Sequence, residues 1–172
     1  MEFKLNLPKY LKKYIVSKHG STLMASYNDA IGQYVCLLIQ SQRLEKPIKK
    51  GNATRWKSDK TVIPSIWDDE MAIEISDDKV FNRGYKRFPA KSNTLFVNRF
   101  TDEFYDEFHR FMDCILPIGF KIQAAIEAFM NQYGLSESEI KVESLHKSYY
   151  RYRKRADKPI RPKRKTHADT EF

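Results

Sequence analysis

The sequence predicts an α+β fold in which helices at both ends of the chain flank a small antiparallel sheet. Apolar and polar residues alternate in several short runs between residues 61 and 97, as they do in strands with one buried face. Before and after that region, apolar residues recur every three or four positions, which is typical of amphipathic helices. The 172 residues include 41% hydrophobic and 13% aromatic residues, enough for the core of one ordinary domain with a small appendage.

The first elements of the chain are a strand and two helices. Alternation over residues 3–7 predicts a short strand. Pro8 suits the first turn of a helix, and Gly20 is typical of a residue that ends one. A second helix is predicted to begin near residues 26–28. It contains the most apolar stretch of the chain, residues 31–39, which we expect to lie in the core.

The sheet is predicted between residues 61 and 97. A short strand is expected at 61–63, and the alternation over 71–75 predicts a second strand. Turn residues then precede Val80-Phe81, which suggests a hairpin. Residues 82–93 are interrupted by Gly and Pro and are expected to form a loop, and 95–97 is predicted as the last strand.

The chain becomes helical after the predicted sheet. Thr101 is the expected cap of one helix, and a second helix over residues 120–133 is expected to stop at Gly134. Ser136 and Glu139 match the capping box S-x-x-E, in which each side chain bonds to the other's backbone N–H. This predicts a short helix, followed by a long basic helix that reaches residue 155.

These elements suggest three regions: an α+β domain over residues 1–100, a helical region over 101–156 that resembles a helix-turn-helix, and a disordered basic tail over 157–172. The helix periodicities also predict ten core positions. The predicted core residues are Leu11, Ile15, Val35, Leu38, Phe104, Phe108, Ile126, Phe129, Leu145 and Tyr149.

The positive charge of the protein lies near its C-terminal end. The chain has a formal net charge of +9, and ten Lys and Arg against one Asp between Lys147 and Lys165 account for all of it. So compact a cluster predicts a polyanionic partner, because it concentrates the electric field. A solvated basic tail without a specific partner is the alternative interpretation.

Tyrosines are interleaved with these cations, and the helical period of about 100° per residue sorts them. Tyr149 and Tyr152 share a face with Leu145, so we expect them to pack on the domain. Tyr150 points the other way and is a candidate for contact with a sugar, base or phosphate. The predicted nucleic-acid-binding residues are Lys147, Tyr150, Arg151, Arg153, Lys154, Arg155, Lys158, Arg161, Lys163, Arg164 and Lys165.

Two predicted loops, residues 45–60 and 82–93, also combine aromatic with basic residues, although fewer of them. Trp56 stands between two cations within residues 45–60, and a ring in this setting can stack on a base. A tryptophan that folds back over the edge of the core is the alternative. The predicted secondary contacts are Arg55, Trp56, Lys57, Arg83, Lys86 and Arg87.

The stretch YGLSESEIKVESLHKSYYRYRKR, residues 133–155, resembles the helix-turn-helix-type DNA-binding ends of small proteins from bacterial phages and mobile elements. The resemblance is confined to the C-terminal fifth of the chain. It implies a regulator or accessory DNA-binding factor whose last helix docks on duplex DNA. An RNA-binding or ribonucleoprotein component and a phage structural or assembly protein are the alternatives that the composition leaves open.

Catalytic motifs are not evident. The four histidines are isolated, and the sequence contains no metal-binding spacing and no phosphate-binding glycine loop. Acidic residues at 68–70 and 77–78 have the chemistry to bind Mg²⁺, as in nucleases, although acidic groups at strand ends more often form turns. We therefore expect a non-enzymatic protein with no cofactor and no metal.

The remaining expectations concern location. No apolar run is long enough to cross a membrane, and no secretory signal is recognisable, so a cytoplasmic protein is expected. Cys36 and Cys114 are far apart in apolar surroundings and are predicted to be buried free thiols.

Overall fold

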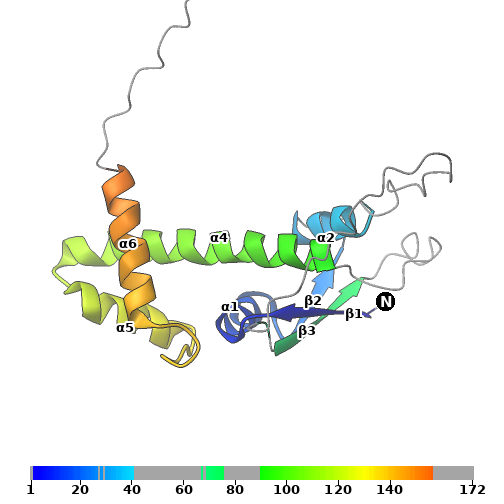
Figure 1. Ribbon diagram of the computed structural model, residues 1–172, viewed down its shortest axis with the longest axis horizontal. Helices are drawn as coiled ribbons and strands as arrows, with labels where there is room; N and C mark the ends of the chain where they lie inside the picture. Colours follow the sequence, from blue (N-terminus) through cyan, green and yellow to red (C-terminus); the bar gives the residue numbers. More distant parts are fainter. Residues whose placement is uncertain are drawn as a thin grey trace, which may run out of the picture.

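The computed structural model describes residues 2–26, 28, 30–40, 67, 69–75 and 90–156. The described residues form five α-helices and a sheet of three strands, which confirms the α+β class. The longest helix, α4 (Ala90–Ile115), runs along the molecule, with the sheet and the first two helices at one end and the last two helices at the other (Figure 1). No helix within the described residues is long and apolar enough to cross a membrane.

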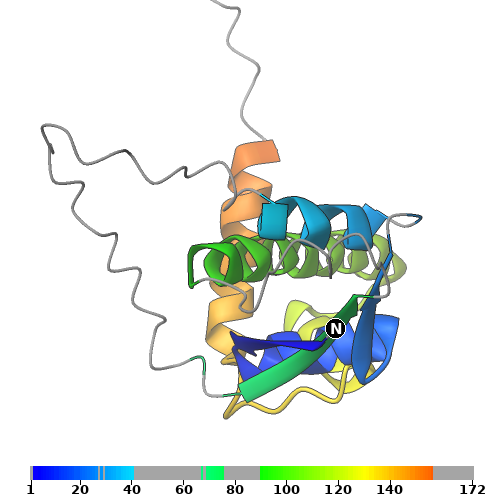
Figure 2. The same cartoon turned by 90° about the vertical axis from the view of Figure 1, so that its right-hand side faces the viewer.

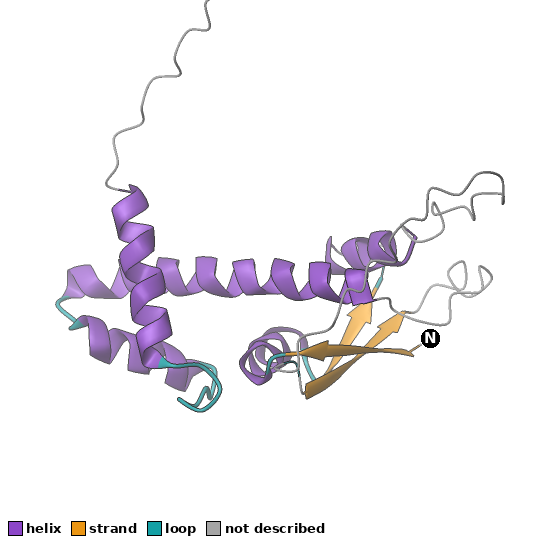
Figure 3. Ribbon diagram, viewed as in Figure 1, coloured by secondary structure: helices purple, strands orange, loops and turns teal. Residues whose placement is uncertain are grey.

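The sheet is mixed, with strand order β1-β3-β2 (Figure 3). The central strand, β3 (Asp69–Ile75), pairs antiparallel with β1 (Glu2–Leu7) and parallel with β2 (Thr22–Ala25). Ile73 lies opposite Phe3 on one side and Leu23 on the other, and all three are buried. The predicted strand over residues 3–7 is confirmed.

The prediction of a purely antiparallel sheet between residues 61 and 97 is therefore wrong. Among the described residues of that region, only 69–75 form a strand, β3, and its partners come from the first 25 residues. Alternation along 71–75 indicates a buried face, but it says nothing about which strand lies alongside. The strand expected at 61–63 and the hairpin partner Val80-Phe81 lie outside the described residues.

Helix α1 (Lys9–His19) connects the two strands that flank β3. It follows Pro8 and ends at Gly20, as predicted, and Gly20 adopts a positive φ of 85°. Its buried face packs against the sheet and α4. Asn93 of α4 completes the outer edge of β1: its Oδ1 accepts from the Asn6 N–H at 3.1 Å, and its Nδ2 donates to the Asn6 carbonyl at 2.8 Å.

Helix α2 (Ala30–Gln40) lies close to the end of β2, beside α4 (Figure 2). Gly32 makes this closeness possible, because a Cβ atom there would overlap the backbone of Ser26. Val35 and Leu38 are buried as predicted, and so is the free thiol of Cys36.

Helix α4 begins at Ala90, so three predictions for this part of the chain are wrong. Residues 90–93, part of the loop expected over 82–93, form the first turn of this helix, and residues 82–89 lie outside the described part. Residues 95–97 are helical and not a strand, and Thr101 lies within the helix and does not cap it. The β-prone run Leu-Phe-Val is overridden by the phenylalanines that recur every four residues from Phe96, all of which are buried on one face. The helix also crosses residue 100 without a break, where the first two predicted regions meet.

The second half of the molecule is helical. A short 3₁₀ turn, η2 (Leu116–Ile118), leads to α5 (Ile122–Gln132), and α6 (Val142–Ala156) follows. Gly134, with φ 59°, closes α5 in a Schellman motif: its N–H bonds to the Asn131 carbonyl and the Leu135 N–H bonds to the Met130 carbonyl.

Two further predictions for this half need correction. The segment after Ser136 forms a turn and not the short helix expected, although half of the capping box is present, since the Ser136 N–H donates to Glu139 Oε2 at 2.9 Å. Cys114 is a free thiol as expected, but it is exposed on the solvent side of α4. The ten predicted core positions are all buried.

Candidate nucleic-acid interface

The basic helix α6 packs on the molecule through the face that its periodicity predicts. Leu145 is fully buried and Tyr149 is only 4% exposed, whereas Tyr150 is 68% exposed. Tyr152 is half-buried beside Tyr149. The predicted rotation of the helix is confirmed, and with it the direction in which its cationic side points.

Polar contacts with α4 hold that rotation. The hydroxyls of Tyr149 and Tyr152 both donate to the Asp113 carboxylate, at 3.1 and 2.7 Å. The ring of His109 stacks on the ring of Tyr152, with centroids 4.4 Å apart and planes 9° from parallel, and its Nε2 lies 3.1 Å from Ser148 Oγ. Five side chains of two helices are thereby joined in one network, which restricts both sliding and rotation of α6.

His109 is the titratable group at the centre of this contact. Burial between α4 and α6 lowers the pKa of its imidazole, because the charged form loses hydration. Asp106 and Asp113 oppose this effect, and the positive charge of Arg155 adds to it. The ring is therefore held in its neutral form at pH 7, and its tautomer depends on its contact with Ser148.

The predicted cations of α6 do not all have the same surroundings. Arg151, Lys154 and Arg155 are all exposed, and Arg155 lies close enough to His109 for its charge to act on that imidazole. Lys147 is paired with Glu143 one turn earlier, at 2.5 Å, so its charge is largely balanced. Arg153 is exposed but donates to the Tyr149 hydroxyl at 3.4 Å, which directs it toward the contact with α4.

The other predicted contact residues lie outside the described part of the chain. This holds for the five tail cations and for the six loop residues proposed as secondary contacts. They are Arg55, Trp56, Lys57, Arg83, Lys86, Arg87, Lys158, Arg161, Lys163, Arg164 and Lys165.

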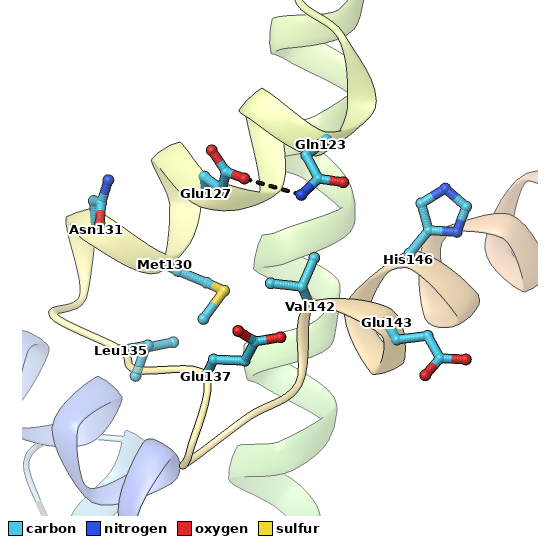
Figure 4. A pocket seen from close by; sticks show the side chains of 9 residues that line it. All are labelled: Gln123, Glu127, Met130, Asn131, Leu135, Glu137, Val142, Glu143 and His146. Atoms are coloured by element: carbon cyan, nitrogen blue, oxygen red, sulfur yellow. Dashed lines mark hydrogen bonds between the residues drawn. The ribbon is translucent and has the colours of Figure 1, made fainter.

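A groove of about 650 Å³ lies between α5, the connection over residues 133–141 and the first turns of α6 (Figure 4). We call it the α5–α6 groove. It is lined by Gln123, Glu127, Met130, Asn131, Leu135, Glu137, Val142, Glu143 and His146. Three of these residues are acidic, so the start of α6 is a negative region while its end is positive.

Helix α1 fixes the position of this helical half. Glu107 of α4 accepts hydrogen bonds from Tyr14 at 2.7 Å and from Tyr133, and it also pairs with Lys18. Burial alone would raise the pKa of Glu107, but the bonds from these three groups outweigh it and lower the pKa. Lys13 adds a second connection through the Gly134 carbonyl at 2.8 Å. Burial, and next the hydrogen bonds to Glu107, raise the pKa of Tyr14 and of Tyr133.

Asp113, His109 and Glu143 are the important site residues that sequence reasoning did not identify. The Glu143–Lys147 pair has a readable signal, since Glu followed by Lys four residues later is a stabilising spacing on a helix. Nothing comparable marks Asp113 and His109, because their partners lie about forty residues further along the chain.

The acidic residues considered for Mg²⁺ have other partners. Asp69 pairs with Lys12 at 2.7 Å, and Glu70 pairs with Lys4 at 3.1 Å. Residues 68 and 77–78 lie outside the described part, and within that part no three His, Cys, Asp or Glu side chains gather as a metal site requires.

Comparisons of the chain with protein-family models, with curated proteins and with solved structures find no match. A function for this chain therefore has to be inferred from the surface of α6 itself.

Proposed function

We propose that this chain is a non-enzymatic DNA-binding protein that docks the exposed side of α6 on duplex DNA, as a regulatory or replication accessory factor does. One observation carries the proposal: α6 buries Tyr149, packs the half-buried Tyr152 against α4, and leaves Arg151 and Lys154 facing solvent. A helix of this kind presents a cationic strip on a rigid support, the arrangement that phosphate contacts need.

The positive charge that reaches a partner comes from the second half of α6 and from the tail. Glu143 balances Lys147, and the α5–α6 groove adds further carboxylates at the start of the helix. A DNA strand lying along the first turns would face these carboxylates and would be repelled. The contact therefore involves the last turns, where Arg151, Lys154 and Arg155 are exposed.

This geometry differs from a helix-turn-helix in two respects. Residues 133–141 join α5 to α6, a longer connection than the three or four residues typical of that motif. A recognition helix also reads bases with its N-terminal residues, and the N-terminal turn of α6 contains Glu143. We therefore propose phosphate contacts along the side of the helix as the main interaction.

Tyr150 favours a second candidate, an RNA or single-stranded DNA partner. Its ring is 68% exposed and precedes Arg151 directly. An exposed ring among cations is a stacking platform for an unpaired base, and such stacking contributes about 1–3 kcal/mol per base.

A fluorescence-anisotropy competition tests the proposal. Duplex DNA, single-stranded DNA and RNA of one sequence are compared at a stated salt concentration. We expect duplex DNA to bind most tightly, and R151E/K154E to abolish binding without changing the thermal melt. The matched control K91E/R99E reverses two exposed cations of α4 and retains binding. Preference for a single strand would favour the second candidate, and equal losses in both variants would contradict α6 as the contact surface.

A further inference from the structure

The α5–α6 groove combines an apolar floor with an acidic rim. Met130 and Leu135, the two residues that the Schellman motif brings together, form the floor with Val142. Glu127 and Glu137 stand on the rim from opposite sides, one on α5 and one on the connection (Figure 4). Met130 and Leu135 are almost fully buried and Val142 is partly buried, so the floor offers a narrow apolar surface beneath the carboxylates. This combination matches the chemistry of a lysine or arginine side chain, which has an aliphatic stem and a charged head.

The negative charge of the groove is centred on these two glutamates. Glu127 accepts a hydrogen bond from Gln123 at 3.0 Å, a neutral donor that does not cancel its charge. Glu143 is less available, because Lys147 pairs with it and Lys141 lowers its pKa further through its nearby charge. His146 lines the groove on the side of α6.

We propose that the α5–α6 groove binds the chain's own basic segment Lys163-Arg164-Lys165. Charge complementarity identifies this occupant, since three consecutive cations would meet the carboxylates of Glu127 and Glu137 while their stems cover the apolar floor. The positive end of α6 repels the same segment, whereas the carboxylates of the groove attract it.

The length of the chain allows this contact. From Glu143 to Ala156 the helix rises by about 20 Å at 1.5 Å per residue. An extended chain covers about 3.3 Å per residue, so six or seven residues beyond Ala156 reach back to the groove. Lys163 is the seventh residue after Ala156. A segment attached this closely has an effective concentration on the order of millimolar, which makes a weak contact sufficient.

While docked in the groove, Lys163, Arg164 and Lys165 could not contact a polyanion. That consequence rests on the proposed function: nucleic acid would have to displace the segment, and the groove would act as an internal competitor that weakens non-specific binding. The docking itself does not depend on nucleic acid, so the two are tested separately.

Paramagnetic relaxation enhancement on the full chain tests the docking. A nitroxide is attached through T166C in a C114S background, where Cys36 is buried. We expect the label to broaden the amides of Glu127, Asn131 and His146 at least about threefold more than those of the sheet at low salt, and high salt to remove the effect. E127Q/E137Q should abolish it.

Two controls make the result specific. E2Q/E74Q changes the net charge by the same amount on the sheet and should retain the broadening. K163Q/R164Q/K165Q should lose it, and because these positions lie outside the described fold, that variant remains informative if the groove variant is unstable.

The experiment also distinguishes other occupants. In a second sample, spin-labelled chain without isotope enrichment is mixed with isotope-enriched chain that carries no nitroxide. Broadening of the groove amides in that mixture would assign the groove to a second copy and overturn the proposal. Equal broadening of the amide signals of the groove and of the sheet in the spin-labelled chain would overturn the proposal as well. Groove broadening in a protein that binds no nucleic acid would leave the docking in place and remove the proposed function.

Discussion

The hydroxyl of Tyr152 donates a 2.7 Å hydrogen bond to Oδ2 of Asp113 and thereby ties the basic helix α6 to α4. The same ring stacks on His109, so its position is held from two directions. This contact fixes the rotation of α6 about its axis and therefore the direction in which its exposed cations point.

Tyr152→Phe should lower the free energy of unfolding by about 0.5–1.5 kcal/mol, the net value of one hydrogen bond. The ring and its stacking on His109 remain, so the loss reports on the hydroxyl. Urea denaturation measures it. Tyr150→Phe is the matched control and should have no effect, because that side chain faces solvent. Equal stability of both variants would mean that Asp113 does not hold the helix.

Tyr149→Ala and Tyr150→Ala should have opposite consequences. The first removes a buried ring and should cost about 3 kcal/mol or more of stability. The second should leave stability within about 0.5 kcal/mol while weakening nucleic-acid binding. Thermal melts and anisotropy titrations of the two variants separate packing from binding. A Tyr150→Ala variant with full affinity would exclude that ring from the contact.

Gly32→Ala should destabilise the protein by on the order of 2 kcal/mol, because the added methyl group overlaps the backbone of Ser26 and cannot move aside. Helix propensity alone predicts the reverse, since alanine stabilises helix interiors relative to glycine by about 1 kcal/mol. Denaturant midpoints decide between the two. Leu37→Ala on the exposed side of α2 is the control and should be nearly neutral.

Stability should fall as the pH drops below about 6.5, the ordinary pKa of histidine. Burial lowers the pKa of His109 in the folded protein, so below that pH the unfolded chain binds the proton more readily, and unfolding is favoured. The free energy of unfolding stops falling for this reason once the pH is below the pKa of His109 in the folded protein. Unfolding free energies between pH 7.5 and 5.5 should show this slope. His109→Gln should flatten the slope, whereas His146→Gln, at an exposed position, should retain it.

The salt dependence of DNA binding should separate the helix from the tail. Each neutralised phosphate contributes about −0.9 to the slope of log affinity against log salt. Arg151, Lys154 and Arg155 give a slope of about −3, and two or three tail contacts bring it to about −5. Removing residues 157–172 should reduce the slope without changing any preference between sequences. A truncated chain that keeps its slope but loses its preference would assign base reading to the tail.

Much of this protein can be read from local patterns. The rotation of α6, its buried Tyr149 and its exposed Arg151 follow from helical periodicity, because a helix must bury one apolar side whatever its partner is. The same reason explains why the ten predicted core positions are buried. Gly20 and Gly134 mark helix ends through a backbone conformation that glycine adopts at little cost.

The hydrophobic periodicity of a strand or helix does not reveal which other element packs against it. The alternation in β3 is equally compatible with a hairpin, and only the path of the chain places it between β1 and a parallel β2. The run at 95–97 is helical because α4 continues the spacing that buries Phe96 and Phe100. Asp113 accepts a hydrogen bond from Tyr152, and Glu127 and Glu137 line one groove, because packing brings together groups that are far apart in the sequence. The apolar side of each element depends on its own sequence, whereas the element that covers that side is chosen by the packing of the whole chain.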